Sequence, residues 1–150
     1  MAPRQLAEVV VALALFQALA DLHPQDIEAR RKLLKTTLVT ADTFSQTDHH
    51  TVRMFDPASR TLTRRAVRIG DQATLYEWLD WMLSPSSNAA AGMVMREAML
   101  LRHFGAAYPV PEAQIQQFFN NTPKGELSAL YARTFNEPVT RAGLDIANLR

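Results

Sequence analysis

A run of apolar residues near the start of the chain limits the folds that this sequence can adopt. From Val9 to Ala20 every residue except Gln17 is apolar. These twelve residues are fewer than the roughly 20 that a membrane-spanning helix requires. Arg4 and the apolar run also resemble a signal peptide, but Glu8 and Gln17 interrupt that pattern. A helix that is apolar on all sides belongs in the centre of a domain. The run therefore predicts a mainly α fold around a central apolar helix, with no membrane span.

Local start and stop signals predict the other helices. Thr74 and Glu77 have the spacing of a capping box, and apolar residues follow at three- and four-residue intervals. Prolines open other helices, and Gly105 ends one. A short helix at 41–46, capped by Thr40, is also predicted, and Pro138 is expected to interrupt the pattern. About six main helices are expected, at approximately 9–20, 24–35, 74–82, 89–104, 111–119 and 123–135.

One β-hairpin is expected at about residues 51–69, inserted between the helices. Residues 51–55 and 61–69 contain β-branched side chains and flank the turn-forming segment 56–60. A solvated edge strand is one role for its positive charge, and contact with an anionic substrate or partner is another. The few aromatic residues and the net charge of +1 argue against nucleic-acid binding. The charged residues of the predicted hairpin are Arg53, Arg60, Arg64, Arg65 and Arg68, with Asp56.

Composition supports a single folded domain over residues 1–150. Hydrophobic residues make up 47% of the chain and charged residues 21%, which suits one soluble domain with a core. The sequence has no cysteine, which excludes disulfides and thiolate chemistry. Adjacent His49 and His50 follow Asp48, but neighbouring strand residues point to opposite faces, so no metal site is predicted. No cofactor is expected.

A polar segment from Ser84 to Asn88 separates two strongly apolar helical segments. Because the loop is short, it would hold Ser86, Ser87 and Asn88 in a nearly fixed geometry. The simplest role is helix capping, with Ser84 before Pro85 at one helix start and Asn88 as the cap of a helix from about residue 89. The other possibility is a site between the helices.

The stretch from Trp78 to Ala91 resembles the helix, Ser-x-Asn turn and helix of serine β-lactamases and penicillin-binding proteins. The resemblance implies that Ser86 relays a proton to the leaving nitrogen and that Asn88 binds the substrate's carbonyl group. Ser87, also assigned to substrate binding, stands where many members have Asp. The resemblance covers about Val9 to the C-terminus and implies the all-helical half of a two-domain hydrolase. It suggests a periplasmic or extracellular location and β-lactam or peptidyl amide substrates.

Two other signatures of that family are absent. Matching the apolar runs places the Ser-x-x-Lys positions on Gln5 and Glu8, and no serine in the chain has a lysine three residues later. An amide is not an acylation nucleophile, so we expect the chain to be inactive as it stands. No Lys-Thr-Gly motif is present, because Lys35 is followed by two threonines. Glu126 is only a loose counterpart of a deacylating glutamate and is better explained by the helix dipole.

We therefore expect a fragment or a degenerate relative of such hydrolases. Its partner would be a missing α/β domain or another protein surface. Aromatic side chains with helical spacing are expected mainly in the core, although some could form the face that meets such a partner. The alternative is a non-catalytic helical interaction module that uses the arginine-rich hairpin.

Overall fold

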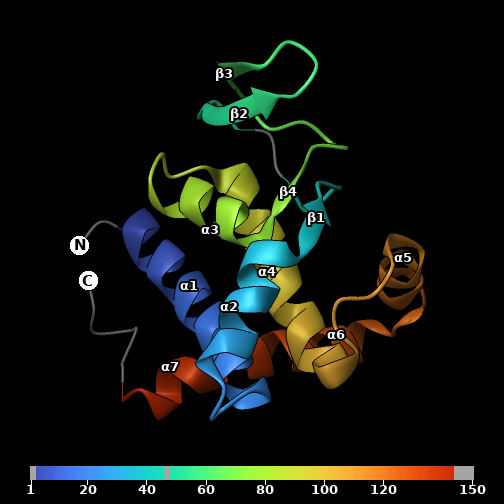
Figure 1. Ribbon diagram of the computed structural model, residues 1–150. Helices are drawn as coiled ribbons and strands as arrows, with labels where there is room; N and C mark the ends of the chain where they lie inside the picture. Colours follow the sequence, from blue (N-terminus) through green and yellow to red (C-terminus); the bar gives the residue numbers. More distant parts are fainter. Residues whose placement is uncertain (1–2, 46–47, 144–150) are drawn as a thin grey trace.

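The fold is mainly helical with one projecting β-hairpin, as predicted. The computed structural model describes residues 3–45 and 48–143 (Figure 1). The helices are α1 (Pro3–Leu22), α2 (Ile27–Thr36), α3 (Leu75–Leu83), α4 (Asn88–Phe104), α5 (Glu112–Asn121), α6 (Lys124–Tyr131) and α7 (Glu137–Arg141), with a 3-10 turn η1 (Gly105–Ala107) and a π-helical turn η2 (Ala132–Asn136). The strands are β1 (Leu38–Thr40), β2 (Val52–Asp56), β3 (Thr61–Arg65) and β4 (Gln72–Thr74).

The core lies where α4 packs against α1 and α3. Helix α4 has ten buried residues, and α1 contributes Val11, Ala14, Leu15, Ala18 and Leu19, which recur every three or four positions. This spacing places them on one face of α1. The predicted apolar helix therefore packs against the bundle by one face, in contact with α3, α4 and α7, and is not enclosed on all sides as expected, because Val9 and Phe16 on α1 remain exposed.

Helix α1 is also long enough and apolar enough to span a membrane. Within the described residues, Gln5–Leu22 is the single such stretch, with a mean hydropathy of 1.6. Signal sequences and the core helices of soluble proteins meet the same requirement, and 39% of this stretch is buried. The absence of a membrane span stays a prediction.

The hairpin of β2 and β3 is confirmed, and a second strand pair was not predicted. Strands β2 and β3 pair antiparallel, from Val52 opposite Arg65 to Asp56 opposite Thr61. Strands β1 and β4 form a separate antiparallel pair of three residues each. So short a pair has no pattern that a sequence could reveal, because it forms between segments 32 residues apart. It fixes the base from which the hairpin projects (Figure 1).

Two local predictions outside the 84–88 loop were wrong. Residues 41–45 form a turn instead of a helix, because the Asp42 side chain accepts a hydrogen bond from the amide of Phe44; residue 46 lies outside the described residues. Pro138 does not interrupt the helical path. It lies in the first turn of α7, where the backbone amide that proline lacks would have no hydrogen-bond partner within that helix. The π-helical turn η2 connects α6 to α7.

Gly92 allows the 41–45 turn to lie directly against α4. A Cβ atom at this position would overlap the carbonyl oxygen of Phe44. Only glycine leaves room for that backbone, so the contact specifies where the turn sits.

We predict that Gly92→Ala destabilises the protein by about 1–3 kcal/mol, the usual cost of overpacking. Gly125→Ala is the control, because Gly125 is also helical and nothing lies within 4 Å of the added Cβ. The free energy of unfolding of this control should be unchanged or higher by up to about 1 kcal/mol. Urea unfolding would measure both; equal stability of the two variants would contradict the tight contact.

A buried charge network connects α4 to α5 and to the 41–45 turn. Arg96 is fully buried, and its guanidinium contacts the carboxylates of Asp42 at 2.8 Å, Glu97 at 2.8 Å and Glu112 at 3.0 Å. Tyr108 donates its hydroxyl proton to Glu97 at 2.7 Å. Burial opposes the charge of Arg96, but the surrounding carboxylates raise the pKa of Arg96 above its usual value. Burial raises the pKa of Glu97, against the opposite effects of Arg96 and Tyr108.

We predict that Arg96→Met lowers the free energy of unfolding by about 3–5 kcal/mol, because it leaves carboxylates without their counter-ion. Adding Glu97→Gln should recover part of this loss, since the most buried carboxylate is then neutral. The control is Arg31→Met, which breaks the exposed pair with Glu28 and should cost at most about 1 kcal/mol. Urea unfolding at pH 7 measures all three variants. Similar losses for Arg96→Met and Arg31→Met would argue against the network.

Candidate functional site

The loop between α3 and α4 joins the two helices through caps at both ends. Ser84 is the C-cap of α3, so the predicted helix start at Ser84 and Pro85 is wrong, and Ser87 is the N-cap of α4. The Ser87 side chain is fully buried, and its Oγ accepts a hydrogen bond from the amide of Ala90 at 3.1 Å. Asn88 is the first residue of α4 and is exposed, so the predicted cap lies one residue earlier than expected. Capping is therefore the role that Ser87 has in this structure.

Ser86 connects this loop to α1. Its hydroxyl donates to Glu8 Oε2 at 3.3 Å, although the two residues are 78 positions apart in the chain. Glu8 is 8% exposed and lies in the first half of α1. Ser86 has φ of 58°, in the left-handed region that costs an L-residue energy. The fold therefore maintains a strained backbone where the hydroxyl meets the carboxylate.

Asp48 occupies the N-terminus of α4, a position that was not predicted from the sequence. Its carboxylate accepts hydrogen bonds from the amide of Asn88 at 2.5 Å and of Ala89 at 3.4 Å, and from His50 at 2.6 Å. Burial alone would raise the pKa of Asp48, but these hydrogen bonds lower it well below its usual range. Together with Ser87, Asp48 uses the free amides of the first turn, so these amides do not form an oxyanion hole.

The signal that could have revealed Asp48 is the Asx turn that it forms with the amide of His50. The contact with α4 spans 40 residues and has no local signature.

No group of three or more His, Cys, Asp or Glu that could hold a metal ion occurs in the described part of the chain.

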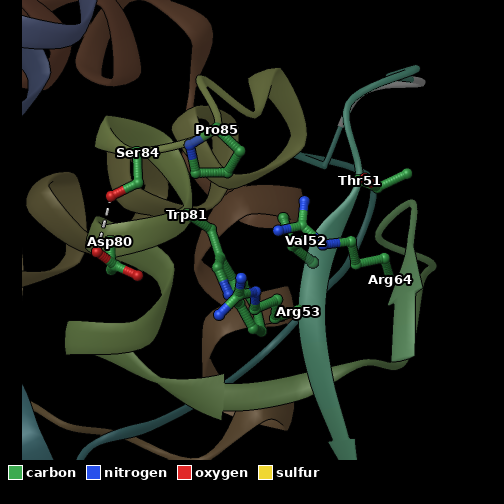
Figure 2. Close-up of a pocket in the computed structure, with 8 residues that line it drawn as sticks. All are labelled: Thr51, Val52, Arg53, Arg64, Asp80, Trp81, Ser84 and Pro85. Atoms are coloured by element: carbon green, nitrogen blue, oxygen red, sulfur yellow. Dashed lines mark hydrogen bonds between the residues drawn. The ribbon is translucent and has the colours of Figure 1, made fainter. Parts of the chain in front are cut away.

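A cleft of about 400 Å³ lies between the hairpin and the end of α3. Figure 2 shows the side chains of Arg53 and Arg64 reaching from the hairpin towards Trp81 and Pro85. On the helical side, Asp80 Oδ1 accepts a hydrogen bond from the Ser84 hydroxyl at 3.0 Å. The cleft thus combines two cations, one carboxylate and an aromatic wall; its lining residues are Thr51, Val52, Arg53, Arg64, Asp80, Trp81, Ser84 and Pro85.

The residues predicted for catalysis and substrate binding are not in the lining of this cleft. Ser84 and Pro85 line it. In contrast, Ser86 contacts α1, Ser87 is buried, and the backbone amide of Asn88 donates a hydrogen bond to Asp48. Glu126 is in the first turn of α6 and lines a different cavity. Ser86 and Glu8 are thus brought together, and Glu126 is not part of this arrangement.

Comparison with known proteins adds no relative. No protein family, no curated protein and no solved structure matches the chain.

We predict that Asp48→Asn lowers the free energy of unfolding by about 1–2 kcal/mol at pH 7, because α4 loses a charged partner at its positive end. A lowered pKa in the folded state means that ionised Asp48 stabilises the fold above its unfolded pKa, near 3.8. That stabilisation is lost as the pH falls further. The difference between the wild-type protein and the variant should therefore shrink below pH 3.8.

The matched control is Asp26→Asn. Asp26 caps α2 from an exposed position, and asparagine caps a helix about as well as aspartate. Its effect should be a few tenths of a kcal/mol. Urea unfolding at several pH values measures both variants. A constant difference for Asp48→Asn down to pH 2 would contradict the assigned role.

Proposed function

We propose that this chain is the helical half of a β-lactamase-like serine hydrolase, in a form that does not acylate. The observation that supports the proposal best is the contact of Ser86 with Glu8. The resemblance requires the Ser-x-Asn turn to face the helix that bears the nucleophile and base. Here the Ser86 hydroxyl meets α1 at the position that corresponds to the base. Two segments that carry separate parts of the resemblance are thus neighbours.

The chemistry at α1 explains why acylation is not expected. Glu8 supplies a carboxylate where the family has a lysine, and Gln5 supplies an amide where the family has the nucleophilic serine. An amide does not form an acyl-enzyme. The Ser86 hydroxyl donates to Glu8, but the nearby α4 amides are used by Asp48 and Ser87. Those amides are therefore not available as oxyanion donors beside Ser86.

The proposed substrate class, β-lactam or peptidyl amides, comes from the resemblance. Asn88 is exposed, so its side-chain amide is available to a substrate carbonyl. The side chains of Val9 and Phe16 on α1 are 43% and 48% exposed. Apolar side chains of this kind suit contact with an α/β half.

A second candidate is a non-catalytic interaction module that uses the arginine-rich hairpin. Arg53, Arg60 and Arg64 are exposed and have no ion pair with any described residue, whereas Arg65 pairs with Asp71 at 2.7 Å. Unpaired cations on a projecting hairpin suit an anionic partner.

The hydrolase proposal is tested by installing the missing motif in α1. The double substitution Gln5→Ser with Glu8→Lys places a hydroxyl and an amine one turn apart, with the amine at the position that contacts Ser86. We expect slow covalent labelling of this variant by a fluorescent penicillin, detected as an intact-mass increase, and no labelling of the wild-type protein.

Two further variants complete this test. Adding Ser86→Ala should slow labelling by about 10²-fold or more, the usual contribution of a proton relay. Gln17→Ser with Ala20→Lys is the control, because it installs the same spacing further along α1, away from Ser86. A folded Gln5→Ser, Glu8→Lys variant that remains unlabelled, or labels no faster than the control, would refute the proposal; so would labelling of the wild-type protein.

A further inference from the structure

The arginines of the cleft are arranged at an energetic cost. Arg53 and Arg64 are directly opposite each other on β2 and β3, so their side chains share one face of the hairpin. Like charges at directly opposite positions destabilise a strand pair. No carboxylate in the described part of the chain forms an ion pair with either residue. An anion between the two guanidiniums would relieve this repulsion.

The rest of the cleft limits what such an anion can carry. Trp81 is 7% exposed and, with Pro85 and Val52, provides apolar surface beside the guanidiniums. Figure 2 shows both arginines directed towards this surface. A volume of about 400 Å³ lies within the size range of small-molecule pockets. The cleft therefore suits a molecule with a charged end and a flat apolar part.

Asp80 determines which anion is favoured. Its carboxylate lines the same cleft, on the wall formed by α3, and its Oδ1 is bound by Ser84. A second negative charge on the ligand would be repelled by Asp80. A carboxylate, with one charge and two oxygens matched to the planar guanidinium, fits better than a dianionic phosphate.

We propose that this cleft is a binding site for a small aromatic or otherwise flat carboxylate, held by Arg53 and Arg64 against Trp81 and Pro85. The site does not include Ser86, Glu8 or Asn88, so the inference does not depend on the proposed hydrolase function.

The test is titration of the full chain with benzoate, phenyl phosphate and uncharged benzamide, followed by NMR chemical shifts of the tryptophan indoles. Benzoate should bind most tightly and should weaken as salt is added. Arg53→Gln and Arg64→Gln should each weaken benzoate binding by about tenfold or more, the effect of losing a charge-assisted hydrogen bond. Arg60→Gln is the control, because Arg60 is exposed on the same hairpin outside the cleft. The affinity of this variant for benzoate should be unchanged.

Each other outcome overturns the proposal. The first is that benzoate does not bind at concentrations up to about 10 mM, which is above the dissociation constants of ordinary small ligands. The second is that benzamide binds as tightly as benzoate, and the third is that the three arginine variants have equal affinities for benzoate. All three arginines are exposed, so the variants should fold, and urea unfolding verifies this. Asp80→Asn tests the selectivity: it should improve phenyl phosphate relative to benzoate, and an unchanged ratio would refute the role of Asp80.

Discussion

The positive charge of Arg96, buried in the centre of the fold, constrains the structure around it. A buried cation is costly unless carboxylates surround it, and here they come from α4 itself, from α5 and from the 41–45 turn. Gly92 lies one helical turn before Arg96 and allows the same 41–45 turn to approach the α4 backbone. Charge compensation and close packing thus hold one segment against α4 at two adjacent points.

The placement of that turn affects the candidate sites. The chain that leaves it reaches Asp48, whose carboxylate binds the N-terminus of α4, and then enters the hairpin. The start of α4, the loop at 84–88 and the first half of α1 meet at this end of the bundle. The cleft beside the hairpin forms where β2 and β3 face the end of α3. The Ser86–Glu8 contact and the arginine pair thus both lie on segments that adjoin the start of α4 or the end of α3.

Features with a local cause could be predicted closely. The capping box of Thr74 and Glu77 forms as expected, with both reciprocal hydrogen bonds, and Gly105 ends α4 with a positive φ. The hairpin follows from its turn residues and β-branched strands. The helix predicted at 41–46 failed because the Asp42 side chain competes for the Phe44 amide and Gly92 accepts the resulting turn. The role of Asp48 could not be foreseen, since it depends on amides 40 residues away.

The sequence by itself determined the helical class, the hairpin and the polar loop between α3 and α4, because apolar periodicity, caps and turn residues act over a few neighbouring positions. It also determined which side chains were available: a carboxylate at Glu8 and a hydroxyl at Ser86. Only the tertiary structure decided that these two meet and that Arg53 and Arg64 face Trp81 across a cleft. Contacts between distant segments depend on how whole elements pack, and no local pattern encodes that packing.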